Sequence, residues 1–236
     1  MILAQTREGA ELGERLIAAS YEVVFVQSGT GRHPALPVSP KYTLSNCDLV
    51  QLEEILCKEG ADFYVEASHA FEAKEAADRL GQHLCKQIYV LRPAWVPQEG
   101  DTWVSVADAK QAAALLMATD RSFVTIGRDE LGAFSQAKGQ LFWRVLRDVT
   151  DPFPFGNGAY VEGRPPFSHD QEVALFERLG INTLVLHNTG SQRADTKLTA
   201  ARELGVKVIM VERPKHKDLA PLSSVEDAIH HIRTAL

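Results

Sequence analysis

The sequence has 236 residues, of which 45% are hydrophobic and 24% charged, and a formal net charge of -6 at pH 7. This composition is typical of a soluble globular protein, and no apolar stretch approaches the roughly 20 residues needed to span a bilayer. The acidic balance argues against nonspecific nucleic-acid binding, which depends on basic surface. The length admits one large domain or two small ones, because domains commonly have about 100–150 residues.

The N-terminus does not resemble a signal peptide, because charged residues between Arg7 and Arg15 interrupt any apolar segment. A cytoplasmic location is therefore the expectation. The three cysteines, Cys47, Cys57 and Cys85, are odd in number and show no CxxC spacing. This pattern argues against a disulfide framework and against a zinc site, so we expect reduced and mostly buried thiols.

The first half of the chain alternates between strands and helices. Ile2–Ala4 is a short apolar strand, a helix follows Gln5, and the β-rich run 21–26 ends at Ser28-Gly29-Thr30-Gly31-Arg32. Such a strand–helix–strand crossover implies a parallel sheet. The remaining elements predicted in this half are a helix after Asp48, a strand at 63–65, a long helix to about Leu84, strands at 88–91 and 103–106, and an alanine-rich helix at 107–118.

From Ser122 the alternation begins again, with a strand at 123–126, the loop and helix start Gly127-Arg128-Asp129-Glu130, and a strand at 141–146. Ser168 with Gln171 fits a capping box for the next helix, and Ser223 with Glu226 opens the last one similarly. We therefore predict an α/β fold of two Rossmann-like domains, each an open, mostly parallel sheet flanked by helices. The predicted domains are residues 1–119 and 120–236, with a hinge near 119–121 and a ligand cleft between them.

The second domain contains the most informative loop. The apolar strand Leu184–His187 ends in Asn188-Thr189-Gly190, and a helix from Lys197 and a further strand at 206–211 follow. In parallel α/β sheets such a loop lies at the carboxyl end of its strand, where ligands bind and the N–H groups of the next helix suit anions. An ordinary turn is the alternative interpretation.

Nine arginines fall at or near predicted strand ends, so a local basic cleft can exist on this acidic protein. For each of them the alternative is a solvated charge on the rim of a helix. They are Arg7, Arg32, Arg92, Arg128, Arg144, Arg147, Arg164, Arg193 and Arg213.

Six short motifs stand in order along nearly the whole chain. They are Glu66-Ala67-Ser68-His69-Ala70-Phe71, Leu91-Arg92-Pro93-Ala94-Trp95, Thr125-Ile126-Gly127-Arg128-Asp129-Glu130-Leu131, Asn188-Thr189-Gly190 with Lys197, Ala200-Ala201-Arg202-Glu203-Leu204 and Val211-Glu212-Arg213-Pro214. In these motifs the chain resembles the precorrin-6A reductase family of cobalamin biosynthesis, with its D-A-T-H-P-F, R-P-x-W, T-T-G-R-x-E-L, N-S-G-G with a lysine, A-A-R-E-L and final R-P. It departs from the family at Ala4–Gly9, where the family has a G-G-T-x-E-A turn, and at Ser191, which replaces the second glycine of N-S-G-G.

The resemblance implies an NADPH-dependent oxidoreductase that transfers a hydride to one double bond of a precorrin-6A-type or cobalt-precorrin-6A tetrapyrrole, without a metal. Its partner is then a small molecule with many carboxylates, which arginine side chains suit. Neither nucleic acid nor membrane is an expected partner, and the expected state is a monomer or weak homodimer. Two alternatives from other classes are a uroporphyrinogen-synthase-like lyase, which needs no nicotinamide, and a non-catalytic binding protein for an anionic ligand.

The resemblance also suggests roles for individual residues. His69 is the candidate catalytic residue, although a capping or packing role is equally open. Trp95 either stacks on the macrocycle or covers the end of the sheet, and the latter is favoured. The candidate substrate-binding residues are Ser68, Arg92, Lys197 and Arg213. The candidate cofactor-binding residues are Thr6, Ser28, Gly29, Thr30, Arg32, Gly127, Arg128, Asn188, Thr189 and Gly190.

Overall fold

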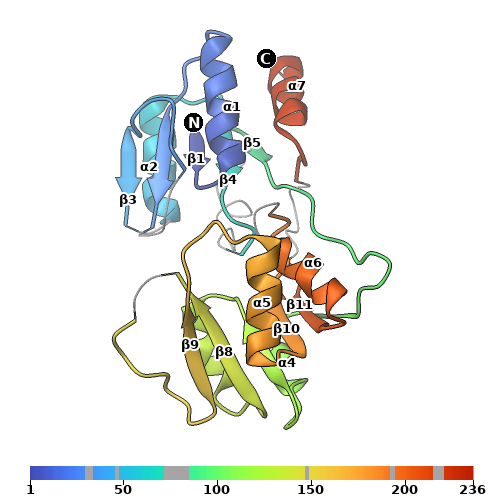
Figure 1. The fold of residues 1–236 in the computed structure, drawn as a ribbon. Coiled ribbons are helices and arrows are strands. Elements are labelled where there is room, and N and C mark those ends of the chain that lie inside the picture. Colours follow the sequence, from blue (N-terminus) through green and yellow to red (C-terminus); the bar gives the residue numbers. More distant parts are fainter. Residues whose placement is uncertain are drawn as a thin grey trace. The chain divides into compact units, whose positions relative to one another are not determined.

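The computed structural model describes residues 1–29, 34–45, 48–71, 85–146, 149–191, 195–214 and 221–235. The chain forms two compact units, unit 1 with Met1–Pro93 and Pro214–Leu236, and unit 2 with Ala94–Arg213. Each unit contains one sheet whose strand pairings are all parallel, flanked by helices (Figure 1). The predicted α/β fold class is therefore confirmed.

Unit 1 is built on a five-stranded sheet with the strand order β3-β2-β1-β4-β5. Because β1 pairs with both β2 and β4, the chain runs outward from the centre of this sheet in two directions. Its elements are β1 (Ile2–Ala4), α1 (Arg7–Ala18), β2 (Phe25–Ser28), β3 (Tyr42–Leu44), α2 (Leu49–Glu59), β4 (Phe63–Ala67), β5 (Lys86–Tyr89) and α7 (Val225–Ala235).

Helix α1 packs unusually close to this sheet because glycines face it. A Cβ atom on Gly9 would lie 2.7 Å from Cβ of Ala67, and one on Gly13 would lie 2.1 Å from the ring of Phe25. The buried Leu12 on the same helix contributes to the core of unit 1. The two glycines thus bring the first turns of α1 against the ends of the central strands.

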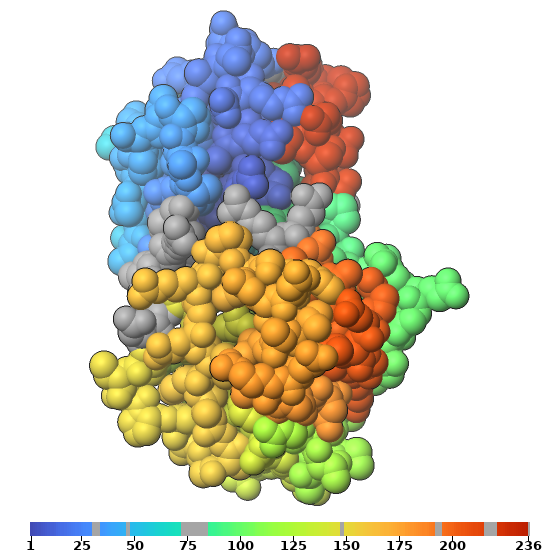
Figure 2. Space-filling model, viewed as in Figure 1, coloured from blue at the N-terminus to red at the C-terminus, as the bar shows by residue number. Residues whose placement is uncertain are grey.

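The C-terminal segment returns to unit 1. Leu222 N donates to Tyr89 O at 2.7 Å, and Val225, Ala228 and Ile232 of α7 belong to the same buried cluster as Leu12. Helices α1 and α7 accordingly lie side by side (Figure 1, blue and red; also Figure 2). The last helix is therefore part of the first sheet's core, although the second sheet separates them in sequence.

Unit 2 is built on a six-stranded sheet with the order β6-β11-β10-β7-β8-β9. Helices α5 and α6 lie side by side on one face of it (Figure 1) and cover a core that includes Phe123, Phe176 and Leu184. Its elements are β6 (Trp103–Val106), α4 (Ala109–Ala114), β7 (Arg121–Val124), the 3₁₀ helix η1 (Arg128–Phe134), β8 (Gln140–Val145), β9 (Gly158–Glu162), α5 (His169–Leu179), β10 (Thr183–His187), α6 (Thr196–Glu203) and β11 (Lys207–Val211).

The division of the chain differs from the expected boundary near 119–121. Strand β6 precedes that boundary but pairs with β11, so one sheet runs through it, and α7 lies in the other unit. The chain crosses between the units near 93–94 and again near 213–214. Alternating strands and helices show where elements lie along the chain, but not which sheet each strand joins.

Several local predictions are confirmed and others are wrong. The capping box of Ser168 and Gln171 is present, whereas the last helix is capped by Ser224, whose Oγ accepts from Asp227 N at 3.1 Å. The helix expected after Gly127 is a 3₁₀ helix, and the short strands β3 and β9 were not predicted. Of the cysteines expected to be buried, Cys57 is exposed. Cys47 and most of the helix predicted up to Leu84 lie outside the described residues.

No helix among the described residues is long and apolar enough to cross a membrane.

Candidate functional site

The carboxyl edge of unit 1, where its parallel strands end, collects the predicted residues of the first half. The strand order reverses direction between β1 and β4, and in open α/β sheets ligands bind outside the carboxyl ends of strands at such a point. Thr6 follows β1, Ser68 and His69 follow β4, and Gly29 follows β2. Gly29 and Ser68, about 40 positions apart in the sequence, and Thr6 and Ser68, about 60 apart, thus lie at the same edge of the sheet.

The turn after β1 is tied to both neighbouring strands. The backbone N–H groups of Gln5 and Thr6 both donate to Ala67 O at 3.1 Å, and Thr6 Oγ1 donates to the same oxygen at 3.1 Å. Gln5 Nε2 donates to Ser28 O at 2.9 Å. Thr6 also caps α1, because its Oγ1 accepts from Gly9 N at 3.4 Å. The start of α1 is thus fixed at the point where the strand order reverses.

Two serine hydroxyls at this edge are buried without a protein partner. Ser28 and Ser68 are each 2% exposed, and the Oγ atom of each has no hydrogen-bond partner among the described residues. A buried hydroxyl without a partner is costly, and such groups usually mark an unplaced water, ion or ligand. Beside Ser28, Gly29 has a φ of +83°, and no atom lies within 4 Å of the position of a Cβ there. No described residue therefore fills the space beside Gly29 or bonds the neighbouring Ser28 hydroxyl.

The other predicted residues of unit 1 lie at the same edge. His69 is exposed beside Ser68, so it is accessible to a ligand and is not a packing histidine. Arg92, which follows β5, has Nη2 2.7 Å from Oε2 of Glu8 in the first turn of α1. This ion pair holds the guanidinium beside the start of α1. Thr30 and Arg32, which the sequence also assigned to the cofactor, lie outside the described residues.

The carboxyl edge of unit 2 collects the predicted residues of the second half. Strands β7 and β10 are paired neighbours, with Thr183 opposite Ser122 and Val185 opposite Val124, and the strand order reverses direction between them. The loops that follow these two strands therefore begin at one edge of the sheet. Both Gly127-Arg128 and Asn188-Thr189-Gly190 leave the sheet at this edge.

Arg128 is exposed, and its guanidinium lies 5.4 Å from the ring centroid of Tyr160 on β9. The same loop is joined to the end of β10, because His187 Nε2 lies 3.2 Å from Oε2 of Glu130. The aromatic ring thus supports the arginine side chain, and the His187–Glu130 contact holds the two loops together.

Asn188 has a structural role that the sequence did not predict. It is 2% exposed, its Oδ1 accepts from Trp95 N at 2.8 Å, and its Nδ2 donates to Trp95 O and to Glu212 Oε2, both at 3.1 Å. Both donors of the amide are used within the protein, so the expected ligand contact through this side chain has no support. Trp95 packs partly buried against the core of unit 2, as favoured from the sequence.

The remaining parts of the β10 loop are better suited to a ligand. Thr189 and Gly190 are partly exposed, and Gly190 has a φ of +65°, which a residue with a Cβ rarely adopts. Arg213, which follows β11, donates from Nε to Asn188 O at 2.6 Å and so holds the same loop in place. This contact gives Arg213 a positioning role beside its predicted role in substrate binding.

Lys197, predicted to bind substrate, lies in the first turn of α6. Burial lowers the pKa of its ammonium group, as does the charge of Arg144, while Glu172 acts in the opposite direction. The structure thereby groups Lys197 with two charged residues that the sequence did not link to it. Arg144 on β8 and Glu172 on α5 form an ion pair of 2.8 Å whose side chains are 8% and 1% exposed.

Gln5, Glu8 and Glu130 are further residues at these edges that sequence reasoning missed. Each acts by holding a neighbouring residue in place, and the only signal for them in the sequence was their position shortly after the end of a strand. Within the described ranges, no group of three or more His, Cys, Asp or Glu side chains is arranged to hold a metal ion. The edges instead offer hydroxyls, helix starts and arginines, which suit anionic ligands.

The comparisons with known proteins agree with one another. The family described as precorrin-6x reductase CbiJ/CobK matches residues 1–233. The chain is 31% identical over 221 residues to a precorrin-6A reductase of Rhodobacter capsulatus, covering 91% of this chain and 87% of that protein. It is 33% identical over 223 residues to one of Rhodococcus erythropolis, covering 91% and 88%. A solved structure of a CobK precorrin-6A reductase aligns with a TM-score of 0.84 and 27% identity, covering 99% of this chain and 95% of that one.

Proposed function

The chain belongs to the precorrin-6x reductase family CbiJ/CobK, and we propose from this premise that it reduces precorrin-6A or its cobalt form with NADPH. Membership makes it an oxidoreductase of cobalamin biosynthesis that acts on a tetrapyrrole, and a reductase of this kind implies a nicotinamide cofactor. The choice of NADPH, the roles of individual residues and the monomeric or weakly dimeric state in the cytoplasm are our proposal.

The carboxyl edge of unit 1 fits a dinucleotide. The observation that carries this assignment is the pair of buried serine hydroxyls, Ser28 and Ser68, for which no hydrogen-bond partner is found among the described residues. Helix N-termini attract phosphate groups, and α1 begins at this edge directly after Thr6. Ser28 and Gly29, at the end of β2, stand where Rossmann-like sheets hold the adenosine ribose.

When bound, the nicotinamide supplies the hydride. The residues of the chain then bind and orient the cofactor and the tetrapyrrole and supply a proton to the tetrapyrrole. Thr6 fixes the start of α1, which holds the phosphates, while Ser28 with Gly29 holds the ribose and Ser68 contributes a hydroxyl beside them. His69, exposed next to Ser68, is our candidate for giving a proton or hydrogen bond to the tetrapyrrole.

The carboxyl edge of unit 2 suits carboxylates or phosphates. Arg128, supported by Tyr160, presents a forked donor at the end of β7, and the partly exposed Thr189 and Gly190 lie in the loop that ends the neighbouring β10. A Cβ on Gly127 would lie 2.2 Å from Oδ1 of Asp129, so glycine at this position lets η1 begin directly after β7. Arg92 and Arg213, each fixed by a hydrogen bond within its own unit, are further candidates for substrate carboxylates.

The direct test is to incubate the protein with precorrin-6A, with and without cobalt, and to follow loss of the nicotinamide absorbance band with NADPH and separately with NADH. We expect turnover with NADPH and a preference for it, because no acidic residue follows β2 to hold a ribose 2′-OH. Ser28→Ala should weaken NADPH binding at unchanged melting temperature. Equal affinity for the two cofactors would contradict the assignment of the ribose to Ser28 and Gly29. Cofactor binding without turnover would favour the non-catalytic alternative.

A further inference from the structure

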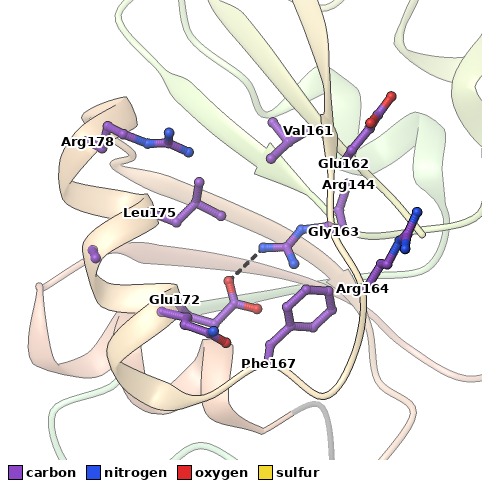
Figure 3. A pocket seen from close by; sticks show the side chains of 11 residues that line it. Arg144, Val161, Glu162, Gly163, Arg164, Phe167, Glu172, Leu175 and Arg178 are labelled. Carbon is purple, nitrogen blue, oxygen red and sulfur yellow. Dashed lines mark hydrogen bonds and ion pairs between the residues drawn. The ribbon is translucent and has the colours of Figure 1, made fainter. Parts of the chain in front are cut away.

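A groove lies between α5 and the edge strand β9 of unit 2 (Figure 3). Its volume is about 450 Å³, which falls within the size range of cavities that bind small molecules. One wall is Val161 of β9 and the other is Leu175 of α5, with Phe167 at one end. Nothing in the proposed function uses it.

The base of this α5–β9 groove is an ion pair with unused hydrogen-bonding capacity. Arg144 and Glu172 meet there at 2.8 Å, and the guanidinium is stacked 4.0 Å from the ring centroid of Phe167 (Figure 3). Although the two side chains are 92% and 99% buried, Nε of Arg144 and Oε1 of Glu172 have no partner among the described residues. The guanidinium of Arg144 is therefore held in place at the base of the groove by Glu172 and Phe167.

The charge of the groove selects the ligand. Three arginines and two glutamates line it, a net charge of +1 on a protein of net charge -6. Glu162 accepts a hydrogen bond from Val149 N, and both Glu162 and Arg164 point away from the Arg144–Glu172 pair (Figure 3), so Arg144, Arg178 and Glu172 carry the net charge of the groove. Arg178 extends from α5 toward Val161, over the apolar walls (Figure 3).

We propose that the α5–β9 groove binds an alkyl carboxylate, which accepts from the guanidinium groups of Arg144 and Arg178 and rests its carbon chain on Val161 and Leu175. A neutral carboxamide would leave the charge of Arg178 without a counter-ion, because Arg144 is already paired with Glu172. The carboxylate has two sources. One is a free organic acid, and the other, which rests on the proposed function, is a carboxylate arm of the tetrapyrrole.

The test uses a fluorine-labelled phenylpropionate as the probe and its primary amide as the neutral control, each titrated against the whole protein by fluorine NMR. We expect the acid to bind and the amide to bind about tenfold more weakly or worse, because charge-assisted hydrogen bonds are lost. Arg178→Gln should weaken binding of the acid by a similar factor. Arg233→Gln, which removes the matching arginine from the last turn of α7, should leave it unchanged.

Adding precorrin-6A separates the two sources. Displacement of the probe, with a raised KM and an unchanged kcat in Arg178→Gln, identifies an arm of the tetrapyrrole, whereas simultaneous binding identifies a free acid. The proposal is overturned if the acid does not bind, if the amide binds as well, or if both arginine variants lose binding equally. Should precorrin-6A fail to be reduced while the probe still binds through Arg178, the proposed function fails and the carboxylate groove stands.

Discussion

Neutralising Glu172 should destabilise unit 2 far more than neutralising a surface glutamate. Glu172 is 1% exposed and bonds Arg144 at 2.8 Å, and Lys197 is a second cation near it. Removing one partner of such a buried pair leaves the other charge uncompensated, which typically costs about 3–5 kcal/mol. For Glu172→Gln, which keeps the shape of the side chain, we expect a loss of about 3 kcal/mol at the lower end of that range.

Urea denaturation followed by tryptophan fluorescence measures this loss in unit 2 alone. The chain has three tryptophans, Trp95, Trp103 and Trp143, and all three lie in unit 2. With an unfolding slope of about 1.5–2 kcal/mol per M urea, the midpoint should fall by roughly 1.5–2 M. Glu203→Gln makes the same chemical change at an exposed contact with His169, and it should move the midpoint by less than about 0.3 M.

A double variant tests the cause. Replacing both charges with apolar side chains of similar length, in Arg144→Met with Glu172→Leu, should cost less than Glu172→Leu alone, because no buried charge is then left without a partner. If the effects of the two single changes simply add, the destabilisation arises from lost packing, and the electrostatic explanation is wrong. A midpoint in Glu172→Gln equal to that of Glu203→Gln would refute it as well.

Three further predictions follow from other contacts. Asn188→Ala should destabilise unit 2 by about 2–3 kcal/mol in the same assay, because Trp95 N and O lose their partner; an unchanged midpoint would show that the contact is not structural. Gly13→Ala should cost about 1–3 kcal/mol by thermal unfolding, because its Cβ would meet the Phe25 ring, whereas Gly132→Ala, with open space around it, should not. Burial lowers the pKa of Lys197 in the folded protein below its ordinary 10.5. Between the folded and the unfolded pKa the unfolded chain binds more protons, so the free energy of unfolding rises with pH. Lys197→Met should flatten that rise, and an identical slope in the variant would contradict the burial.

The sequence by itself determined the fold class, the family and the loops that carry the candidate site. Apolar runs such as Leu184–His187 followed by glycine and polar residues are local patterns, and local patterns are sufficient to place a strand and its exit. Because all strands of a parallel sheet end at one edge, the expectation of two parallel sheets also implies that the loops after their strands gather at that edge.

Only the tertiary structure decided which strand joins which sheet and which polar groups are already satisfied. Strand β6 pairs with β11 and α7 packs on α1, pairings between segments about 100 and 200 residues apart that depend on burial of nonlocal surface and leave no periodic signal. For the same reason the sequence predicted a ligand contact for Asn188, although its amide hydrogen-bonds to Trp95. It likewise identified Arg144 only as one of several arginines near strand ends. Its partner Glu172 lies on a later helix, and only packing brings the two charges together.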